Sequence, residues 1–186
     1  NHNRNIEKLF DDKIDLLIVV GGGSLQPECY DRPHNDEIQP HRDITEEKLI
    51  RYCIKHGIPI VATCRGMQYI NVLFGGRLHY HPKLKIERPR GVDHPVRLVK
   101  EDRIIQVNNY HQDVIYEGEL APCFEVLAVD EQNHTIEAYG SEEMKLLALQ
   151  WHPERKFETA EAQEEGSAQH VEADPEVGVK FDEVSE

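Results

Sequence analysis

Apolar residues in the first half of the chain form two short continuous runs, with a segment of helical periodicity between them. The runs cover residues 14–20 and 58–62 and are rich in β-branched residues, which is typical of strands buried on both faces. Between them, Asp43 and Glu46 have capping-box spacing, and the apolar positions that follow fall on one helical face. This pattern predicts a helix over residues 44–56. Strands that alternate with helices predict an α/β fold, with a mostly parallel central sheet and helices on both faces.

The remaining pattern adds a second helix and a group of short strands. An amphipathic segment follows the second strand directly and ends at Gly75, whereas residues 24–42 are rich in proline and polar residues and are expected to form a loop. The strand over residues 14–20 is apolar at nearly every position, so we expect it to be interior, with a neighbour on each side. A turn is predicted at residues 131–134. Further short strands are predicted at residues 96–99, 104–107, 124–129, 135–138 and 146–150.

The chain has 186 residues, the size of one ordinary domain, and its charge is unevenly distributed. The formal net charge is −14, and ten of the 35 acidic residues lie within residues 157–186 beside a single lysine. That segment has too little apolar content to offset its chain entropy by burial. We therefore expect a folded domain over residues 1–156 and a disordered acidic tail over residues 157–186.

Charge and hydropathy exclude several classes of function. An acidic balance argues against a nucleic-acid partner, because affinity for nucleic acid comes largely from basic side chains that neutralise phosphates. No apolar run approaches the roughly 20 residues that a membrane span needs, and the start of the chain leads into no signal-type apolar segment. We expect a cytoplasmic protein without membrane association.

Cysteine and histidine spacing gives no support for a metal or a cofactor. The four cysteines lie far apart without a C-x-x-C pair, which favours neither a zinc cluster nor a disulfide framework. His79, His81, Asp93 and His94 lie in a loop-rich stretch without metal-ligand spacing. We interpret these four residues as the rim of an active site, and we expect no metal and no cofactor.

Cys64 has the surroundings of a nucleophile. It lies between a predicted buried strand and a predicted helix, where a turn lifts a side chain out of the sheet. Ala62 and Gly66 are small enough for the sharp backbone path, and the helix amides and dipole are expected to lower the pKa of the thiol. A buried structural cysteine is the alternative, and for a cysteine considered alone it is the better interpretation.

Two further features favour the nucleophile. His152 follows the last predicted strand, where it can accept the thiol proton, and Glu154 can hold the imidazole by its other nitrogen. The glycine turn over residues 21–23 ends the neighbouring strand, and its amides, with that of Arg65, can meet a tetrahedral oxyanion. The carboxyl ends of parallel strands are the expected place for such a site. A Cys-His-Glu triad is therefore predicted.

Several motifs follow one another in the order of a known family. They are Cys64-Arg-Gly-Met-Gln68, the Gly-Gly-Arg-Leu stretch at 75–78, Val107-Asn-Asn-Tyr-His111, Thr135-Ile-Glu-Ala138 and Gln150-Trp-His-Pro-Glu154. With these motifs the chain resembles the class I glutamine amidotransferase-like proteins, and within them the γ-glutamyl hydrolases of the peptidase C26 type. The resemblance covers residues 14–155 and implies the flavodoxin-like fold of those proteins.

The resemblance also implies roles for single residues. The nucleophile, the base and the residue that orients the base are expected to be Cys64, His152 and Glu154. The oxyanion hole is expected to be formed by Gly22, Gly23 and Arg65. The residues that contact the substrate are expected to be Gln68, Tyr110 and His111.

The residues and the resemblance together predict a cysteine-dependent hydrolase that acts on a small-molecule γ-glutamyl amide. Cys64 attacks the γ-carbonyl, a thioester forms as the amine departs, and water releases glutamate. Two alternatives stay open: a glutaminase domain that passes ammonia to a synthase partner, and a truncated, non-catalytic member. The family normally has further β-α units before residue 14, so we expect a chain that is N-terminally short. If it is complete, its exposed apolar surface is expected to favour a homodimer.

Overall fold

The computed structural model describes residues 14–26, 38–81 and 89–155. In chain order the elements are β1 (Leu17–Val19), α1 (Pro40–Lys55), β2 (Ile60–Thr63), α2 (Arg65–Leu73), β3 (His79–Tyr80), β4 (Asp93–Leu98), β5 (Arg103–Asn108), β6 (Asp113–Val114), β7 (Glu125–Asp130), β8 (Thr135–Ser141) and β9 (Leu146–Leu149). Neither helix in these ranges is long and apolar enough to cross a bilayer. The predicted acidic tail lies outside the described residues.

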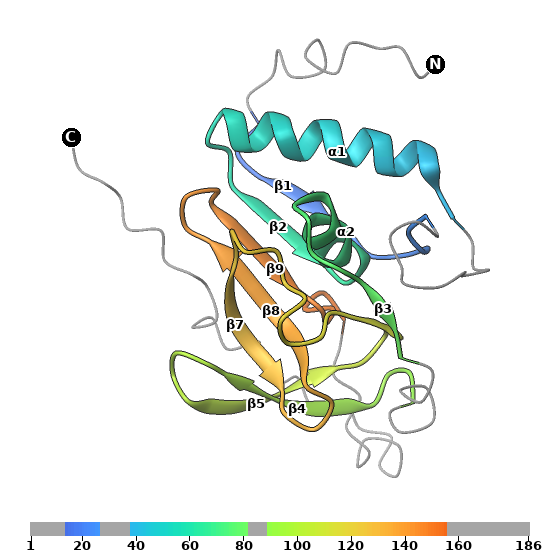
Figure 1. Cartoon of the computed structure of the whole chain (residues 1–186), viewed down its shortest axis with the longest axis vertical. Coiled ribbons are helices and arrows are strands. Elements are labelled where there is room, and N and C mark those ends of the chain that lie inside the picture. Colours follow the sequence, from blue (N-terminus) through green and yellow to red (C-terminus); the bar gives the residue numbers. More distant parts are fainter. Residues whose placement is uncertain (1–13, 27–37, 82–88, 156–186) are drawn as a thin grey trace.

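Seven strands form one mixed sheet in the order β1-β2-β9-β8-β7-β4-β5, and β3 pairs with β6 apart from it (Figure 1). The strands β1, β2 and β9 are parallel, and every pairing from β9 to β5 is antiparallel. The connection from β1 to β2 runs through α1, the kind of crossover that parallel neighbours need, whereas short turns join β7, β8 and β9. The predicted α/β class is confirmed, with the parallel part of the sheet limited to three strands in the described residues.

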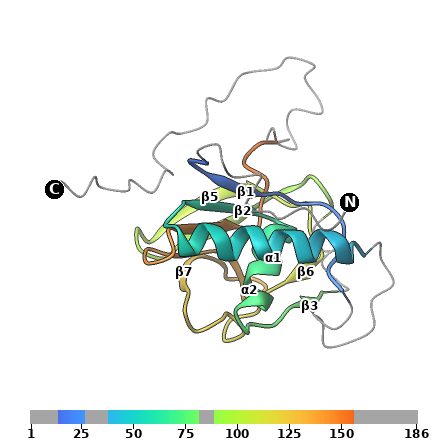
Figure 2. The same ribbon diagram turned by 90° about the horizontal axis from the view of Figure 1, so that it is seen from above.

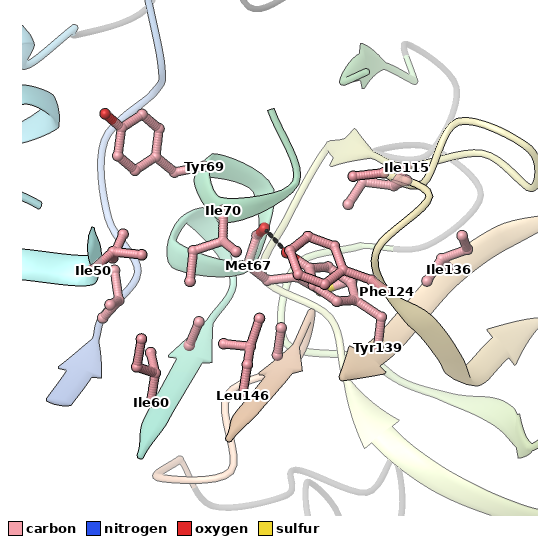
Figure 3. Close-up of a cluster of buried hydrophobic side chains, with 14 of the residues drawn as sticks. Ile50, Ile60, Met67, Tyr69, Ile70, Ile115, Phe124, Ile136, Tyr139 and Leu146 are labelled. Atoms are coloured by element: carbon pink, nitrogen blue, oxygen red, sulfur yellow. Dashed lines mark hydrogen bonds between the residues drawn. The ribbon is translucent and has the colours of Figure 1, made fainter. Parts of the chain in front are cut away.

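Both described helices cover the same face of the parallel strands, whereas the sequence predicted helices on both faces (Figure 2). Ile50 and Cys53 of α1 and Met67 and Ile70 of α2 belong to one buried apolar cluster with alternate side chains of β2 and β9. Figure 3 shows this cluster, in which the Tyr139 hydroxyl donates a hydrogen bond of 2.6 Å to the carbonyl oxygen of Met67. The core therefore fixes α2, which begins directly after Cys64, against the sheet.

The opposite face of the sheet has a smaller apolar core around Trp151. At the edge of the sheet, β1 has β2 as its one neighbour among the described residues. Along this strand, Leu16, Ile18 and Val20 are exposed to 45%, 57% and 55%. The sequence predicted a neighbouring strand on each side of β1. Among the described residues, β1 has a neighbour on one side.

Helix α1 begins earlier than predicted, at Pro40 rather than residue 44. Proline suits the first helical turn because an N–H at that position would have no intrahelical acceptor. Gln39 is the N-cap. The predicted capping box is wrong, because Asp43 is buried inside the helix and its carboxylate binds the guanidinium of Arg65. The expected loop over residues 24–42 accordingly ends before Pro40.

The strands predicted in the second half of the chain are all present as β4, β5, β7, β8 and β9, and residues 131–134 form the predicted turn. The two-stranded sheet of β3 and β6 was not predicted, because strands of two residues are too short to show an alternating pattern.

We expect Gly66→Ala to disrupt the packing of α2 against β1. A Cβ atom at Gly66 would lie 2.2 Å from the carbonyl oxygen of Val19, and this backbone atom belongs to a strand paired with β2, so it cannot swing aside as a side chain could. Chemical denaturation should show a loss of about 3 kcal/mol or more, the upper range for overpacking. The control is Gly75→Ala, where nothing lies within 4 Å and φ is +94°. It should lose only about 1 kcal/mol, the left-handed penalty. Equal losses in the two variants would contradict the expected clash.

Candidate active site

Cys64 joins β2 to α2 in a backbone conformation that residues with side chains rarely adopt. Its φ is +51° and its ψ is −111°. Its N–H donates to the carbonyl oxygen of Leu149 at 2.8 Å, and its carbonyl oxygen accepts from the N–H of Gln68 at 3.1 Å. Hydrogen bonds on both sides of the turn therefore stabilise this strained conformation. The thiol lies at the carboxyl end of β2 and the N-terminus of α2.

His152 is fixed both through its ring and through its backbone. Its Nδ1 lies 2.6 Å from Oε1 of Glu154, and because a carboxylate can only accept, this nitrogen donates and Nε2 is left as the basic nitrogen. The side chain of Asn108 donates to the carbonyl oxygen of His152 at 2.8 Å and accepts from its N–H at 3.0 Å. Asn108 was missed by the sequence reasoning, although it lies within one of the quoted motifs.

Glu154 stays ionised beside the imidazole. Partial burial by itself raises the pKa of this carboxyl, but the hydrogen bond and charge of His152 and the charge of Arg155 lower the pKa overall. An ionised Glu154 favours the Nδ1–H tautomer of His152 and stabilises the imidazolium that forms when Nε2 takes up a proton.

Gly21, which follows β1, is the point at which Cys64 and His152 meet. A Cβ atom built on Gly21 would lie 2.7 Å from Cε1 and 3.3 Å from Nε2 of His152, and 3.2 Å from Cβ of Cys64. Both side chains therefore border the same small volume above the Gly21 backbone, and any larger residue would fill it. This glycine was not singled out from the sequence, because three consecutive glycines do not reveal which one faces the thiol.

The other two glycines of the turn face α1. Both have positive φ, +92° at Gly22 and +72° at Gly23, so the turn requires glycine for its backbone path. A Cβ atom at Gly22 would have Arg42 as its nearest neighbour at 4.0 Å, and one at Gly23 would lie 3.2 Å from Gln39. Gly22 and Gly23 could contribute to an oxyanion hole only through their backbone N–H groups.

The expectation of a lowered thiol pKa is wrong. Burial raises the pKa of Cys64 to about 11, a hydrogen bond from the N–H of Arg65 lowers it, the charge of Asp113 raises it and that of Arg155 lowers it. The amide and the dipole of a short helix are weaker than the cost of a buried thiolate. Cys64 therefore rests as a neutral thiol, and any attack by its sulfur would need a base to take up the proton.

Arg65 points its side chain away from the thiol and into the contact with α1. Its guanidinium is 1% exposed and binds the carboxylates of Asp43 and, at 2.6 Å, of Glu46. A buried cation with two acid partners is well compensated, whereas removal of one partner would leave an unpaired buried charge. The side chain thereby ties the first residue of α2 to α1, while its N–H stays at the thiol.

Arg42 holds the glycine turn from the side of α1. Its guanidinium donates to the carbonyl oxygens of Val20 at 2.5 Å, Gly21 at 3.1 Å and Gly22 at 2.6 Å, and its Nε donates to Glu46 at 2.6 Å. Three consecutive carbonyls bound by one planar side chain fix the peptide planes of the turn. The sequence placed Arg42 at the end of the expected loop over residues 24–42 and did not show these backbone partners.

The three residues expected to contact substrate lie in different surroundings. Gln68 is buried and donates to the carbonyl oxygen of Asp113 at 3.1 Å and to the side chain of Gln150 at 3.3 Å. The ring of Tyr110 meets the imidazole of His152 edge to face, with centroids 5.5 Å apart. His111 is buried instead, and its Nδ1 lies 3.1 Å from the carbonyl oxygen of Asp113.

One buried group has donors close enough for a metal ion in the described part of the chain. Atoms of His94, His111 and Glu137 lie within 4.8 Å of one another. Burial raises the pKa of Glu137, but the charge of His111 and the hydrogen bond and charge of His94 lower it overall. Nε2 of His94 lies 3.5 Å and Nε2 of His111 lies 3.9 Å from the Glu137 carboxylate, so the three side chains form one buried polar network. His94 is in this network rather than in the expected rim, whereas His79 packs on Tyr116.

The profile of the Peptidase C26 family matches residues 2–154, most of the chain. Protein NtpR of Enterococcus hirae is 32% identical over 77% of this chain and 68% of its own length. The gamma-glutamyl-gamma-aminobutyrate hydrolase of Escherichia coli O157:H7 is 36% identical over 44% of this chain and 32% of its own length.

The fold is also that of a solved glutamine amidotransferase from Thermotoga maritima. The two structures superpose with a TM-score of 0.56 at 18% identity, over 82% of this chain and 59% of that chain. The predicted class I glutamine amidotransferase fold is confirmed. This chain therefore spans only part of the length of the proteins that it matches.

Arg42→Gln should loosen the glycine turn. Loss of charge-assisted hydrogen bonds worth about 1.5–3 kcal/mol should speed amide hydrogen exchange in peptides over residues 18–25 by roughly ten- to hundredfold. The matched control is Arg51→Gln, because Arg51 makes the same kind of ion pair within α1, to Glu47 at 2.8 Å, but contacts no described carbonyl of the turn. Unchanged exchange in Arg42→Gln, or equal changes in both variants, would contradict this role of Arg42.

The raised thiol pKa predicts how alkylation of Cys64 depends on pH. Iodoacetamide reacts with thiolates, so the rate at Cys64 should rise about tenfold per pH unit from neutral pH and level off only near the pKa of about 11. Peptide mass spectrometry separates this site from the other three cysteines of the chain, and a Cys123→Ser background removes the one that is exposed among the described residues. A plateau already below pH 8 would show a resting thiolate and contradict the prediction.

Proposed function

The chain belongs to the peptidase C26 family of glutamine amidotransferase-like proteins, and from this premise we propose that it hydrolyses a γ-glutamyl amide with Cys64 as nucleophile. The observation that carries the proposal is that Cys64 and His152 border one volume above Gly21 while Glu154 holds the other imidazole nitrogen. The name of the Escherichia coli relative, a gamma-glutamyl-gamma-aminobutyrate hydrolase, supports this bond type.

In the first half-reaction, Nε2 of His152 removes the thiol proton as Sγ of Cys64 attacks the γ-carbonyl carbon. Concerted proton transfer suits a thiol whose pKa is raised by burial to about 11, because no free thiolate has to accumulate. The imidazolium, stabilised by Glu154, returns the proton to the leaving amine as the C–N bond breaks. The products are a free amine and a γ-glutamyl thioester on Cys64.

In the second half-reaction, water takes the place that the amine has left. Neutral His152 removes a proton from this water, and the oxygen attacks the thioester carbonyl. The C–S bond breaks, Cys64 regains the proton from His152, and glutamate is released. One water is consumed for each amide bond, and the resting protonation states are restored.

Backbone amides are proposed to stabilise the oxyanion in both half-reactions. The N–H of Arg65, already hydrogen-bonded to the thiol, is one donor, and the N–H groups of Gly22 and Gly23 are the others. Their precise aim depends on the turn that Arg42 holds. Gln68 and Tyr110 are proposed to contact the glutamyl group, with His111 supporting the segment that carries Tyr110.

Delivery of ammonia to a synthase partner is the alternative within the same family, and it uses the same thioester. The two functions differ in the leaving group. A glutaminase releases ammonia from glutamine, whereas the proposed hydrolase releases a substituted amine. A substrate series therefore separates them.

We expect glutamate release from γ-glutamyl alkylamides to exceed release from L-glutamine, measured as kcat/KM for both. Cys64→Ala should abolish turnover of every substrate, because alanine can form no thioester, and Cys123→Ala should leave turnover unchanged. Turnover of glutamine alone would favour the ammonia-donating alternative. No turnover of any γ-glutamyl amide, or activity retained in Cys64→Ala, would refute the proposed function.

His152→Ala should lower kcat by about 10²–10⁴-fold, the usual contribution of a general base. Glu154→Gln should cost less, since it keeps the hydrogen-bonding shape and removes only the charge that stabilises the imidazolium. Circular dichroism of each variant checks the fold. An effect of Glu154→Gln as large as that of His152→Ala would contradict the orienting role.

A further inference from the structure

Two arginines lie against the aromatic ring that borders the catalytic histidine. The guanidinium carbon of Arg155 lies 4.1 Å from the ring centroid of Tyr110, and that of Arg90 lies 5.6 Å from it. The same ring meets the imidazole of His152 edge to face at 5.5 Å. Both guanidinium groups are therefore one aromatic ring away from the proposed base.

The backbone places both arginines at this ring. The N–H of Arg155 donates to the carbonyl oxygen of His152 at 3.1 Å, which closes the turn after β9. The N–H of Gly91 donates to the carbonyl oxygen of Asn109 at 2.7 Å, which holds the residue next to Arg90 beside the residue next to Tyr110. Their position at the site is thus fixed by main-chain bonds, although both side chains are exposed.

These two cations have no ion-pair partner among the described residues, unlike several other arginines of the fold. Arg42, Arg65 and Arg97 each bind a carboxylate at 2.7 Å or less. Neither Arg90 nor Arg155 has a salt-bridge partner in residues 14–26, 38–81 and 89–155. In a chain of net charge −14, two like charges over one ring are an unusual arrangement, because each raises the energy of the other.

Stacking leaves these groups ready to bind an anion. An aromatic ring occupies the flat face of a guanidinium, and the N–H groups on its edge stay available for a carboxylate, which they bind in pairs. Glu154 is the nearest acid in sequence to Arg155, but its carboxylate is bound to Nδ1 of His152. The charge of Arg155 reaches the reacting group, since it lowers the pKa of the Cys64 thiol against the larger effect of burial.

We propose that Arg155 and Arg90, both over the ring of Tyr110, form an anion subsite that binds a carboxylate of the γ-glutamyl substrate. The proposal rests on the proposed function and adds to it that substrates are selected by negative charge. The carboxylate belongs either to the amine half or to the α-position of the glutamyl half. Both sources offer the same chemistry to the guanidinium groups.

The test uses three substrates that differ by one charge each. The first is the γ-glutamyl amide of 5-aminopentanoate, the second is its terminal carboxamide, and the third has a carboxamide at the α-position instead. Wild type should prefer the first substrate over one of the two neutralised ones by about tenfold or more in KM, as charge-assisted pairing implies. Arg155→Gln and, to a smaller extent, Arg90→Gln should remove that preference with little change in kcat.

Each neutralised substrate lacks one of the two carboxylates. The one against which the preference disappears in the variants identifies the carboxylate that is bound. Arg103→Gln is the matched control, because Arg103 is equally exposed but lies at the end of β5 opposite to Asn108. It should change no ratio. Preferences that survive in both Arg155→Gln and Arg90→Gln, or that fall equally in Arg103→Gln, would overturn the subsite.

Binding to the Cys64→Ala variant separates this proposal from the proposed function. Isothermal titration should show that the first substrate binds more tightly than its neutralised form, and that adding Arg155→Gln removes the difference. If wild type is inactive and this binding pattern holds, the subsite stands and the proposed hydrolysis fails. If wild type is active and binding is independent of charge, the hydrolysis stands and the subsite fails.

Discussion

The lack of space between the end of β1 and the start of α2 sets the geometry on which the rest of the site depends. At Gly21 a single methyl group would collide with His152, and at Gly66 it would collide with the backbone of Val19. The edge strand and the helix therefore approach as closely as two backbones can. Cys64, between them, has to turn within one residue, which is why it adopts a positive φ of +51° that its side chain disfavours.

The same close packing decides the chemistry of the thiol. Burial raises the pKa of Cys64 to about 11, more than the N–H of Arg65 can offset. In the proposed reaction, a neutral resting thiol makes the position of His152 decisive, because attack and proton transfer have to occur together. That explains why this histidine is held by Glu154 at its ring and by Asn108 at its backbone.

Charge is distributed in two contrasting ways around this centre. Behind the site, α1 supplies acids that compensate Arg42 and Arg65, so that ion pairs fix the glycine turn and the first turn of α2. Beside the ring of Tyr110, Arg90 and Arg155 have no ion-pair partner among the described residues. Ion-paired arginines hold a structure together, whereas exposed arginines without a described ion pair are suited to an external anion.

The local sequence pattern was enough to predict the elements that carry the proposed active site. The run over 58–62, the small residues around Cys64 and the apolar strand before His152 predicted a strand-turn-helix and a strand end, and both are present. These features depend on neighbours in sequence, through β-branched propensity and the steric needs of a sharp turn. The same local reasoning misjudged Asp43, whose spacing imitates a helix cap while its carboxylate binds Arg65.

Contacts between distant segments were decided only by the tertiary structure. Sequence spacing cannot show that Gly21, rather than its two neighbours, faces the thiol, or that His94 pairs with Glu137 instead of bordering the site. It also gave the wrong sign for the pKa of Cys64, because desolvation depends on everything packed around the thiol. The sequence by itself determined which residues are chemically able to react. The tertiary structure decided which of them meet and in what dielectric, since both depend on packing between strands and helices far apart in the chain.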